Sequence, residues 1–298
     1  MNILGIDAGG SNSRFWLYNS DDKRLICDFK FEDGLNLTST TVSEQKLILK
    51  KAFKKLGEFV DFKEYRIDKI VCSVSGAGEK GRKNKFEQLV KSIFNCESVI
   101  VMSDIEALRR ILIEDNESNE EKKGIVVIAG TGSIAFSHNG YRIGGWGHLF
   151  DDEASGFSIG LRIIKNFFNY IDGVEPYDII FDWLLDYFGI KIDDVVKITN
   201  IQKNKKFKAK IASITKFMPL TPLVKKIIEE EINLFTEKIK VLAGKSDTKV
   251  IYTHGGMFEN SFYRETFVKQ LSDYEVHIET LQVHVELAKL LSDWLKLI

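Results

Sequence analysis

The sequence repeats one local pattern, in which a short run of β-branched and other apolar residues ends in small residues. The pattern occurs at residues 2–6, 69–74, 98–102, 124–128 and 249–253. Buried parallel strands read as continuous apolar runs, and the loops at the carboxyl ends of such strands are where α/β proteins bind ligands. The pattern therefore predicts an α/β protein whose functional residues follow these runs.

The segments that follow the runs are of two kinds. Three runs lead into helical patterns, at 83–94, 105–113 and 261–271. The runs at 2–6 and 124–128 lead instead into hairpins, with further strands expected at 14–18, 24–29 and 134–137; the last precedes Asn139-Gly140, a strong hairpin signal. One glycine-bearing hairpin thus opens each half. This predicts a duplicated α/β architecture with an active site between the halves.

Composition and charge exclude several classes of protein. Lys plus Arg is 42 and Asp plus Glu is 43, a net charge of −1, so no overall field attracts the chain to nucleic acid or an anionic membrane. The five lysines of 203–210 are interpreted as a solvated helix face or loop. Sparse cysteines, Cys27, Cys72 and Cys96, exclude a disulfide scaffold and fit a reducing compartment. With neither a signal peptide nor a transmembrane segment recognised, we expect a cytoplasmic protein.

Two glycine-rich turns follow the hairpin-forming runs. The segment Asp7-Ala8-Gly9-Gly10-Ser11-Asn12-Ser13 places a carboxylate at a strand end, followed by a turn whose N–H groups can approach a phosphate. Gly130-Thr131-Gly132-Ser133 is a second such turn, with two hydroxyls. Because a nucleotide held between two domains needs a phosphate loop from each, the pair indicates a nucleotide site. Gly255-Gly256 fits close packing against a nucleobase or ribose, or a simple βα turn.

Two other nucleotide motifs are excluded. Residues 130–135 satisfy the dinucleotide pattern GxGxxA, but that pattern requires a helix directly after the glycines, and a hairpin is expected here. Gly244-Lys245-Ser246 looks like the end of a Walker A loop, but Ile239 stands where its first glycine is required.

Asp104 follows the run at 98–102 and is our candidate general base. A carboxylate at a strand end between two phosphate loops can lie against an acceptor hydroxyl. The alternative is that Ser103 or Asp104 is simply a helix N-cap, for which both residue types are suited.

Residues 144–156 form the densest cluster of unusual residues, with four glycines, Trp146, His148 and the acids Asp151, Asp152 and Glu153. Loops of this composition tend to be functional. Adjacent acids beside glycine and tryptophan suit a sugar, because its hydroxyls need acceptors and its ring faces suit an aromatic side chain. A metal site formed by His148, Asp151 and Asp152 is the rival interpretation.

These motifs resemble the N-acetylglucosamine kinase group of the BadF/BadG/BcrA/BcrD ATPase family, in the actin, sugar-kinase and Hsp70 superfamily. Residues 7–13 and 130–133 are similar to its two phosphate motifs, 253–257 to its adenosine motif and 144–153 to its sugar-site segment. The resemblance implies ATP-dependent phosphorylation of an amino sugar between two ribonuclease-H-like domains, residues 1–117 and 118–298. The helix expected at 282–298 could join the first domain.

The resemblance also implies roles for individual residues. Asp104 falls at the catalytic base, and Asp7 falls where a carboxylate holds hydrated Mg²⁺. Sugar contacts are implied for Asn36, Ser75, Gly76, Asp104, Thr131, Gly145 and Asp152. Nucleotide contacts are implied for Gly9, Gly10, Ser11, Asn12, Gly130, Thr131, Gly132, Ser133, Gly255 and Gly256.

The expected function is therefore transfer of phosphate from ATP to the 6-hydroxyl of an N-acetylated amino sugar. N-acetylglucosamine is the first choice of acceptor, with N-acetylmuramic acid and glucosamine as alternatives. The rival from another class is an ATP-binding switch without kinase activity. The resemblance also makes a homodimer plausible. Iron–sulfur activators of the same family need clustered cysteines, which this chain lacks.

Overall fold

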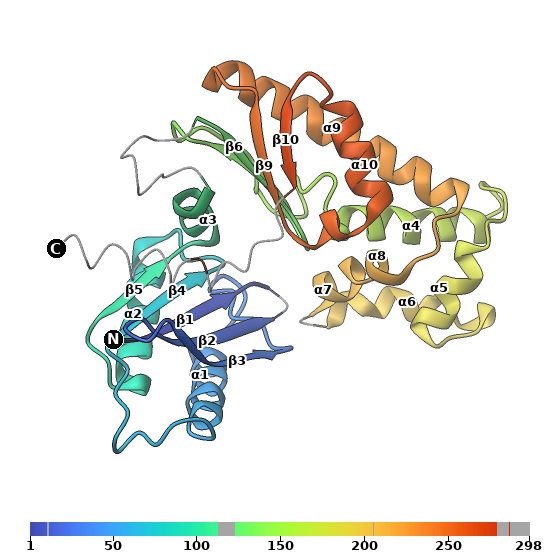
Figure 1. Ribbon diagram of the computed structural model, residues 1–298. Coiled ribbons are helices and arrows are strands. Elements are labelled where there is room, and N and C mark those ends of the chain that lie inside the picture. Colours follow the sequence, from blue (N-terminus) through green and yellow to red (C-terminus); the bar gives the residue numbers. More distant parts are fainter. Residues whose placement is uncertain (11, 113–122, 205, 279–285, 287–298) are drawn as a thin grey trace. The chain divides into compact units, whose positions relative to one another are not determined.

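The computed structural model describes residues 1–10, 12–112, 123–204, 206–278 and 286 (Figure 1). The chain divides into two compact units, residues 1–122 and 123–280. The domain boundary expected between residues 117 and 118 lies outside the described residues, as does the helix expected at 282–298, except for Glu286. Each unit is a mixed α/β body built on its own sheet.

The first unit contains β1 (Asn2–Ala8), β2 (Ser13–Asn19), β3 (Arg24–Phe31), α1 (Val42–Leu56), β4 (Lys69–Val74), α2 (Lys80–Phe94), β5 (Val99–Met102) and α3 (Asp104–Leu112). Its strand order is β3-β2-β1-β4-β5. The first three strands form an antiparallel meander, whereas β4 and β5 continue the sheet parallel to β1. Asp7 is in register with Ser73, and Ser73 with Met102, so the carboxyl ends of three adjacent strands coincide.

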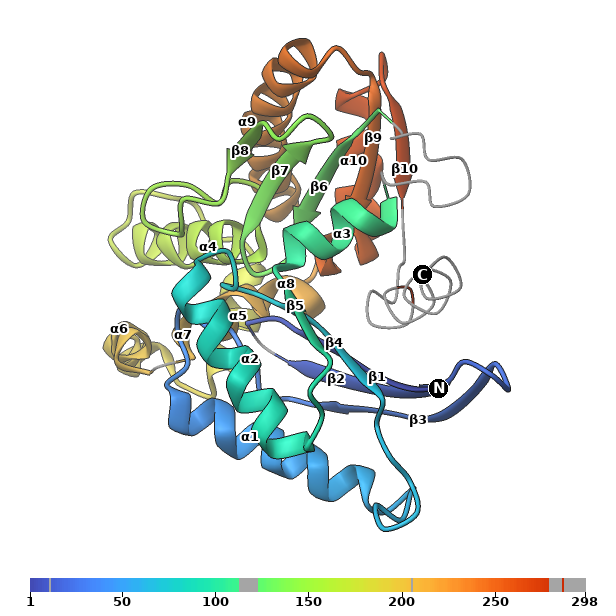
Figure 2. The same cartoon turned by 90° about the vertical axis from the view of Figure 1, so that its left-hand side faces the viewer.

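Helices α1 and α2 lie side by side along one face of this sheet (Figure 2). A capping box starts α1, because Thr41 accepts from the N–H of Glu44 while the Glu44 carboxylate accepts from the N–H of Thr41. Apolar residues of both helices pack with those of the strands into one core. This core holds the strand ends in place, and burial of its apolar surface is the main stabilising contribution.

The second unit contains β6 (Ile125–Ala129), β7 (Ser133–Ser137), β8 (Arg142–Gly144), α4 (Gly156–Ile171), α5 (Ile180–Phe188), η1 (Ile192–Asp194), α6 (Val196–Thr199), η2 (Asn200–Lys203), α7 (Phe207–Ala212), α8 (Ile214–Phe217), α9 (Pro222–Ser246), β9 (Val250–His254), η3 (Gly256–Glu259), α10 (Ser261–Gln270) and β10 (Glu275–Ile278). Its strand order is β10-β9-β6-β7-β8. Here too an antiparallel meander, β6 to β8, is extended by strands parallel to its first strand. The two sheets share one topology, which confirms the predicted duplicated α/β architecture.

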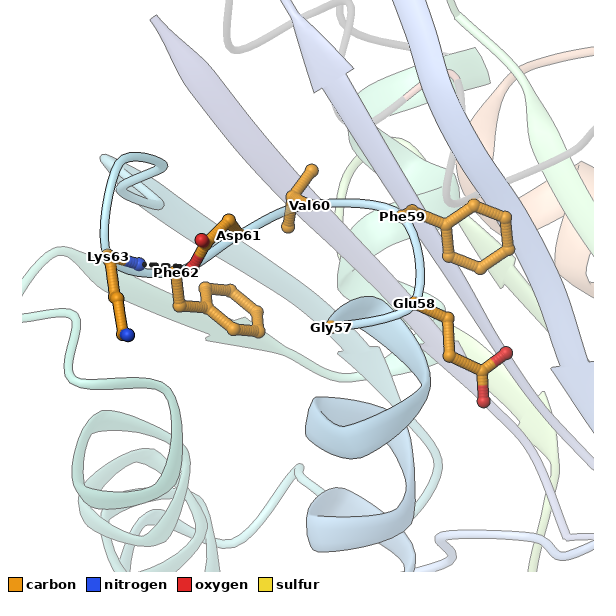
Figure 3. Close-up of a pocket in the computed structure, with 7 residues that line it drawn as sticks. All are labelled: Gly57, Glu58, Phe59, Val60, Asp61, Phe62 and Lys63. Atoms are coloured by element: carbon orange, nitrogen blue, oxygen red, sulfur yellow. Dashed lines mark hydrogen bonds between the residues drawn. The ribbon is translucent and has the colours of Figure 1, made fainter.

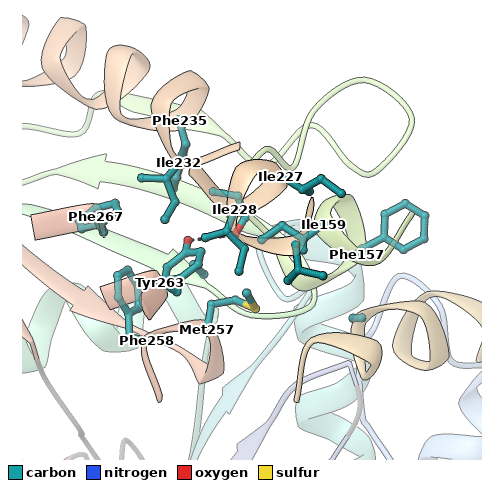
Figure 4. Close-up of a cluster of buried hydrophobic side chains, with 14 of the residues drawn as sticks. Phe157, Ile159, Ile227, Ile228, Ile232, Phe235, Met257, Phe258, Tyr263 and Phe267 are labelled. Carbon is teal, nitrogen blue, oxygen red and sulfur yellow. Dashed lines mark hydrogen bonds between the residues drawn. The ribbon is translucent and has the colours of Figure 1, made fainter. Parts of the chain in front are cut away.

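Helices α4, α9 and α10 supply much of the core of the second unit, which is rich in Ile and Phe (Figure 4). Helix α4 packs closely on α7 because Gly160 has no side chain. A Cβ at this position would lie 2.4 Å from the backbone oxygen of Ile211. Among the residues that the structure describes, no helix combines the length and the apolar character that crossing a membrane requires.

Gly160→Ala tests this packing. The added methyl would press on backbone atoms of α7, so we expect a loss of about 1–3 kcal/mol in the free energy of unfolding. Gly244→Ala is the matched control, because Gly244 is also in a helix and a Cβ there would meet nothing within 4 Å. That variant should gain about 0.5–1 kcal/mol. Urea unfolding followed by circular dichroism measures both, and equal stabilities would contradict the packing argument.

Candidate functional site

Side chains from three adjacent strand ends meet in the first unit. Asp7 lies near the end of β1, Ser75 directly after β4 and Asp104 after β5. The Ser75 hydroxyl donates to Oδ2 of Asp104 at 2.7 Å, and the Ser75 N–H donates to the carbonyl of Ala8 at 2.9 Å. The predicted base is therefore oriented by a hydroxyl on the neighbouring strand end.

Ser103, not Asp104, supplies the side-chain cap of α3. Its hydroxyl accepts from the N–H of Glu106 at 3.1 Å, as an N-cap residue does. The Asp104 carboxylate instead accepts from Ser75 and, through Oδ1, from the N–H of Ile105 at 3.0 Å. The interpretation as a simple helix N-cap therefore applies to Ser103. It does not account for the orientation of the Asp104 carboxylate toward Ser75.

Asn36 lies beside the same group of residues. The N–H of Leu37 donates to the carbonyl of Ser75 at 2.9 Å. Gly76 has φ of +81°, and a Cβ there would lie 3.0 Å from Oδ1 of Asn36. Asn36 Oδ1 accepts from the N–H and hydroxyl of Thr38. The structure therefore brings together the predicted residues Asn36, Ser75, Gly76 and Asp104.

Burial raises the pKa of Asp7 to about 6, against the ordinary value of 3.8. The nearby Asp104 raises this pKa further, while the hydroxyl of Ser73 and the guanidinium of Arg14 lower it. Arg14 pairs across β1 and β2 with Asp7, but its guanidinium is hydrogen-bonded to Asp28 at 2.8 and 2.5 Å. Two carboxylates, Asp7 and Asp104, therefore lie close enough at this strand end to repel each other.

The first glycine turn is open on one side. The N–H of Gly9 donates to the carbonyl of Asn12 at 3.0 Å, and a Cβ at Gly9 or Gly10 would meet nothing within 4 Å. Ser11 lies outside the described residues. On the other side the turn abuts Gly34, where a Cβ would lie 2.4 Å from the Gly10 oxygen. Gly34 was not predicted as part of the site, although a glycine shortly after a strand is a signal for a close backbone approach.

The second glycine turn is held by the start of α4. The N–H groups of Gly156 and Phe157 donate to the carbonyls of Gly130 and Thr131 at 2.8 and 3.3 Å. In a trans peptide the C=O and the following N–H point in opposite directions. The N–H groups of Thr131 and Gly132 therefore face away from α4.

Gly255 brings the third predicted glycine segment to the same strand end. It has φ of +114°, and a Cβ there would lie 2.3 Å from the carbonyl oxygen of Ala129. Only glycine fits so close to the end of β6. A Cβ at the neighbouring Gly256 would meet nothing within 4 Å, so its backbone can be approached from outside.

Ser133 and Asp152 face each other at the second turn. The N–H of Ser133 donates to Oδ1 of Asp152 at 3.3 Å, and the Ser133 hydroxyl donates to the carbonyl of Glu153 at 2.6 Å. Both donors of Ser133 are thus used within the loop. Burial raises the pKa of Asp152, and Asp151 adds to this, while the Ser133 N–H, Lys208 and His148 lower it.

The rest of the 144–153 segment surrounds Asp152. Gly145 has φ of +71° and donates its N–H to the carbonyl of Ser133 at 3.1 Å. Trp146 is two-thirds exposed and has the Arg142 guanidinium 4.2 Å from its ring centre. The His148 ring packs edge-on against Phe157 and Phe207, and burial lowers its pKa.

The rival metal interpretation receives no support from this segment. Asp151 accepts from Lys238 Nζ at 2.8 Å and from the N–H of Trp146 at 3.3 Å. Among the described residues, no three His, Cys, Asp or Glu side chains gather as a metal site would require.

A pocket elsewhere in the first unit is unrelated to these residues. It is lined by residues 57–63, directly after α1 (Figure 3). Phe62 in this loop stacks on Phe53 of α1, with ring centres 4.5 Å apart, and Phe59 stacks on Phe29 of β3. These contacts attach the loop to the core, and the pocket carries none of the predicted site residues.

The comparisons with known proteins decide the family. Residues 4–287 match the BadF/BadG/BcrA/BcrD ATPase family, which is most of the chain. The protein belongs to this family. The resemblance inferred from the glycine turns and the 144–153 segment is thereby confirmed.

Curated relatives of this ATPase-family protein include two kinases. The N-acetylmuramic acid/N-acetylglucosamine kinase of Clostridium acetobutylicum is 29% identical over 278 residues, covering 88% of this chain and 87% of that protein. The N-acetyl-D-glucosamine kinase of Dictyostelium discoideum is 26% identical over 234 residues, covering 74% of this chain and 69% of that protein.

Solved structures show the fold of this ATPase-family chain. A protein from Porphyromonas gingivalis superimposes with a TM-score of 0.74 at 16% identity, covering 95% of this chain and 97% of that one. A ROK family glucokinase from Streptomyces griseus, in complex with glucose and AMPPNP, gives a TM-score of 0.60 at 12% identity, covering 99% and 100%. The predicted fold class, with two domains of the actin-like ATPase kind, is confirmed.

Asp7→Asn should stabilise the protein at neutral pH. Because the folded-state pKa of Asp7, about 6, exceeds the ordinary 3.8, this group favours folding below pH 3.8, and the contribution is lost as pH rises through 6. A shift of roughly two pKa units corresponds to on the order of 2–3 kcal/mol. The free energy of unfolding of the variant should therefore exceed that of the parent by about that amount near pH 7.5 and be close to it near pH 4.

Urea unfolding at both pH values, in buffer with a metal chelator, measures this difference. Asp273→Asn, at an exposed position, is the control. An Asp7→Asn variant no more stable than the parent near pH 7.5 would contradict the assignment of a charge penalty to Asp7.

Proposed function

We propose that this protein is a sugar kinase that transfers the γ-phosphoryl group of ATP to the 6-hydroxyl of an N-acetylated amino sugar, with N-acetylglucosamine as the preferred acceptor. The observation that carries the proposal is the strand-end arrangement of Asp104, hydrogen-bonded to Ser75 and flanked by Asn36 and Gly76. The kinase names of the curated relatives support the same reaction.

Asp104 would act as the general base. Its carboxylate accepts the proton of the attacking hydroxyl while the new bond to phosphorus forms, and the bond from phosphorus to the ADP oxygen breaks. The Ser75 hydroxyl holds the carboxylate in one orientation. Asn36, Ser75 and Gly76 would position the sugar, with Thr131, Gly145 and Asp152 as further sugar contacts from the second unit.

The glycine turns would bind the nucleotide, with one phosphate loop assigned to each unit. In the first, Gly9 and Gly10 leave the backbone accessible; in the second, the N–H groups of Thr131 and Gly132 face away from α4. Such preorganised donors stabilise the charge of the transferred group. Ser133 supports the second loop through its bonds to Asp152 and Glu153. The other residues that we assign to nucleotide contacts are Ser11, Asn12, Gly130, Gly255 and Gly256.

Asp7 fits the role of holding a hydrated magnesium ion. Its carboxylate is a hard oxygen donor, and a nearby cation would stabilise the charged form that burial disfavours. When bound, the ion would neutralise phosphate charge. Asp7 would hold the ion at this strand end, and Asp104 would remain available to accept the proton. The expected homodimer and cytoplasmic location stay predictions.

The ATP-binding switch is the alternative that the first experiment addresses. ADP release from Mg-ATP is measured with N-acetylglucosamine, N-acetylmuramic acid, glucosamine, glucose and no sugar. The proposal predicts release that depends on an N-acetylated sugar. Release without sugar, or ATP binding without turnover, would favour the switch, and dependence on glucosamine alone would make the protein a glucosamine kinase.

Asp104→Asn should retain sugar binding and lose most turnover. Because the amide cannot accept the proton, we expect kcat to fall by about 10²–10⁴-fold. Isothermal titration with the sugar and steady-state kinetics measure the two properties separately. Glu106→Gln, on the same helix, is the control. An unchanged kcat in Asp104→Asn would overturn the role of Asp104 as base.

Lys208 bears on which sugar is accepted. It lies on α7 and lowers the pKa of both Asp152 and His148, so its ammonium is within electrostatic range of the 144–153 segment. N-acetylmuramic acid differs from N-acetylglucosamine by a lactyl ether that carries a carboxylate. The positive charge of Lys208 would offset the repulsion between that carboxylate and Asp152.

Lys208→Gln should therefore discriminate between the two sugars. Losing about 1 kcal/mol of attraction would lower kcat/KM for N-acetylmuramic acid about fivefold and leave N-acetylglucosamine nearly unchanged. Lys210→Gln, whose ammonium lies over the Phe188 ring, is the matched control on the same helix. Equal losses for both sugars would contradict a role in recognising the carboxylate.

A further inference from the structure

The turn that carries Asp152 has an unusual backbone. Asp152 has φ of +79° and Ala154 has φ of +63°, although neither residue is glycine. This left-handed region costs a residue with a side chain roughly 1–2 kcal/mol. Ala154 is also fully buried. Such a conformation persists only where surrounding groups hold it, and residues of this kind cluster at functional sites.

Two distant side chains hold both backbone groups of Ala154. Oε2 of Glu231, on α9, accepts from the Ala154 N–H at 2.9 Å. The hydroxyl of Tyr263, on α10, donates to the Ala154 carbonyl at 2.9 Å. Burial raises the pKa of Tyr263, so this hydroxyl stays protonated and can donate. Tyr263 is fixed in turn by its place in the apolar core (Figure 4).

Glu231 is a buried carboxylate with several partners. It is 4% exposed, and its Oε2 also accepts from the Ser158 hydroxyl at 2.7 Å. Its Oε1 lies 3.4 Å from the guanidinium of Arg162. Both partners belong to α4, so the Glu231 carboxylate is held in one position from which it can bind the turn.

The turn connects α9 and α10 to the second glycine loop. The Ser133 hydroxyl donates to the Glu153 carbonyl at 2.6 Å, and the Ser133 N–H donates to Asp152 at 3.3 Å. A second residue of α9, Lys238, binds Glu153 at 2.7 Å and Asp151 at 2.8 Å. Residues 231 and 238 are about two turns apart, so they lie on one face of α9.

We propose that Glu231 is a positioning residue for the reaction proposed above: it holds the turn 152–154 so that Asp152 and the loop Gly130–Ser133 face the substrates. The inference rests on the proposed function. Glu231 acts through Ala154 and touches no substrate. Loss of its acceptor would let Ala154 leave the left-handed region and move Asp152 and Ser133 with it.

Glu231→Met tests the proposal, because it removes the acceptor while keeping an apolar side chain of similar volume. We expect kcat for sugar phosphorylation to fall by about 10²-fold, the cost of misplacing reacting groups by roughly 1 Å. KM for the sugar should change less, because most of the proposed sugar contacts belong to the first unit. Glu231→Gln keeps an oxygen for Ala154 and Ser158, so it should restore most of the activity.

Glu230→Gln is the matched control. Glu230 precedes Glu231 on α9 and also pairs with Arg162, but it is half-exposed, and the structure gives it no contact with the turn. Wild-type kinetics are expected for this variant. If Glu231→Met kept the kcat of Glu230→Gln, or if its activity fell only in proportion to its unfolded fraction, the positioning role would be overturned.

Hydrogen exchange separates this inference from the proposed function. The Ala154 amide should exchange faster in Glu231→Met than in the parent and in Glu230→Gln, since its acceptor is gone. Unchanged exchange would overturn the anchoring whatever the enzyme's activity. If the parent phosphorylated no sugar while exchange at Ala154 rose as expected, the proposed function would fail and the anchoring of the turn by Glu231 would stand.

Discussion

Parallel pairing of β1 with β4 and of β4 with β5 is the constraint on which the proposed sugar site depends. It brings three strand ends to one edge of the sheet, and therefore Asp7, Ser75 and Asp104 to one place. This position has a cost, because burial raises the pKa of Asp7 to about 6 and the nearby Asp104 adds to the rise. A site that keeps two carboxylates together at the expense of stability is suited to a cation and to proton transfer.

The second unit has the same topology, and contacts with its helices and with Asp152 hold its glycine loop in place. Its glycine loop is held from behind by the first N–H groups of α4 and from the side by Asp152. Asp152 in turn depends on Ala154, whose two backbone groups are held by Glu231 and Tyr263. The proposed phosphate loop of this unit is therefore positioned by the long helix α9 and by α10, far from it in sequence.

The duplicated architecture and most strands could be predicted, because continuous apolar runs and the glycines after them are local signals. The hairpin signal at Asn139-Gly140 implied a strand where β8 lies without giving its bounds, and β10 was not predicted, because three or four residues are too few for a pattern. The packing of Gly34 on Gly10, and the anchoring of Ala154 by Glu231, 77 residues away, could not be predicted, because such contacts exist only after folding. The nucleotide contact of Ser133 stays a prediction; its tertiary contacts with Asp152 and Glu153 had no local signal in the sequence.

The position of the transferred phosphate tests the account most directly. A phosphorus–proton correlation spectrum of the product formed from N-acetylglucosamine and Mg-ATP reports which carbon carries the new phosphate. The account predicts coupling of the phosphorus to the two protons on carbon 6, since Asp104 is assigned to the 6-hydroxyl. Coupling to the anomeric proton, or inorganic phosphate with unchanged sugar, would contradict it.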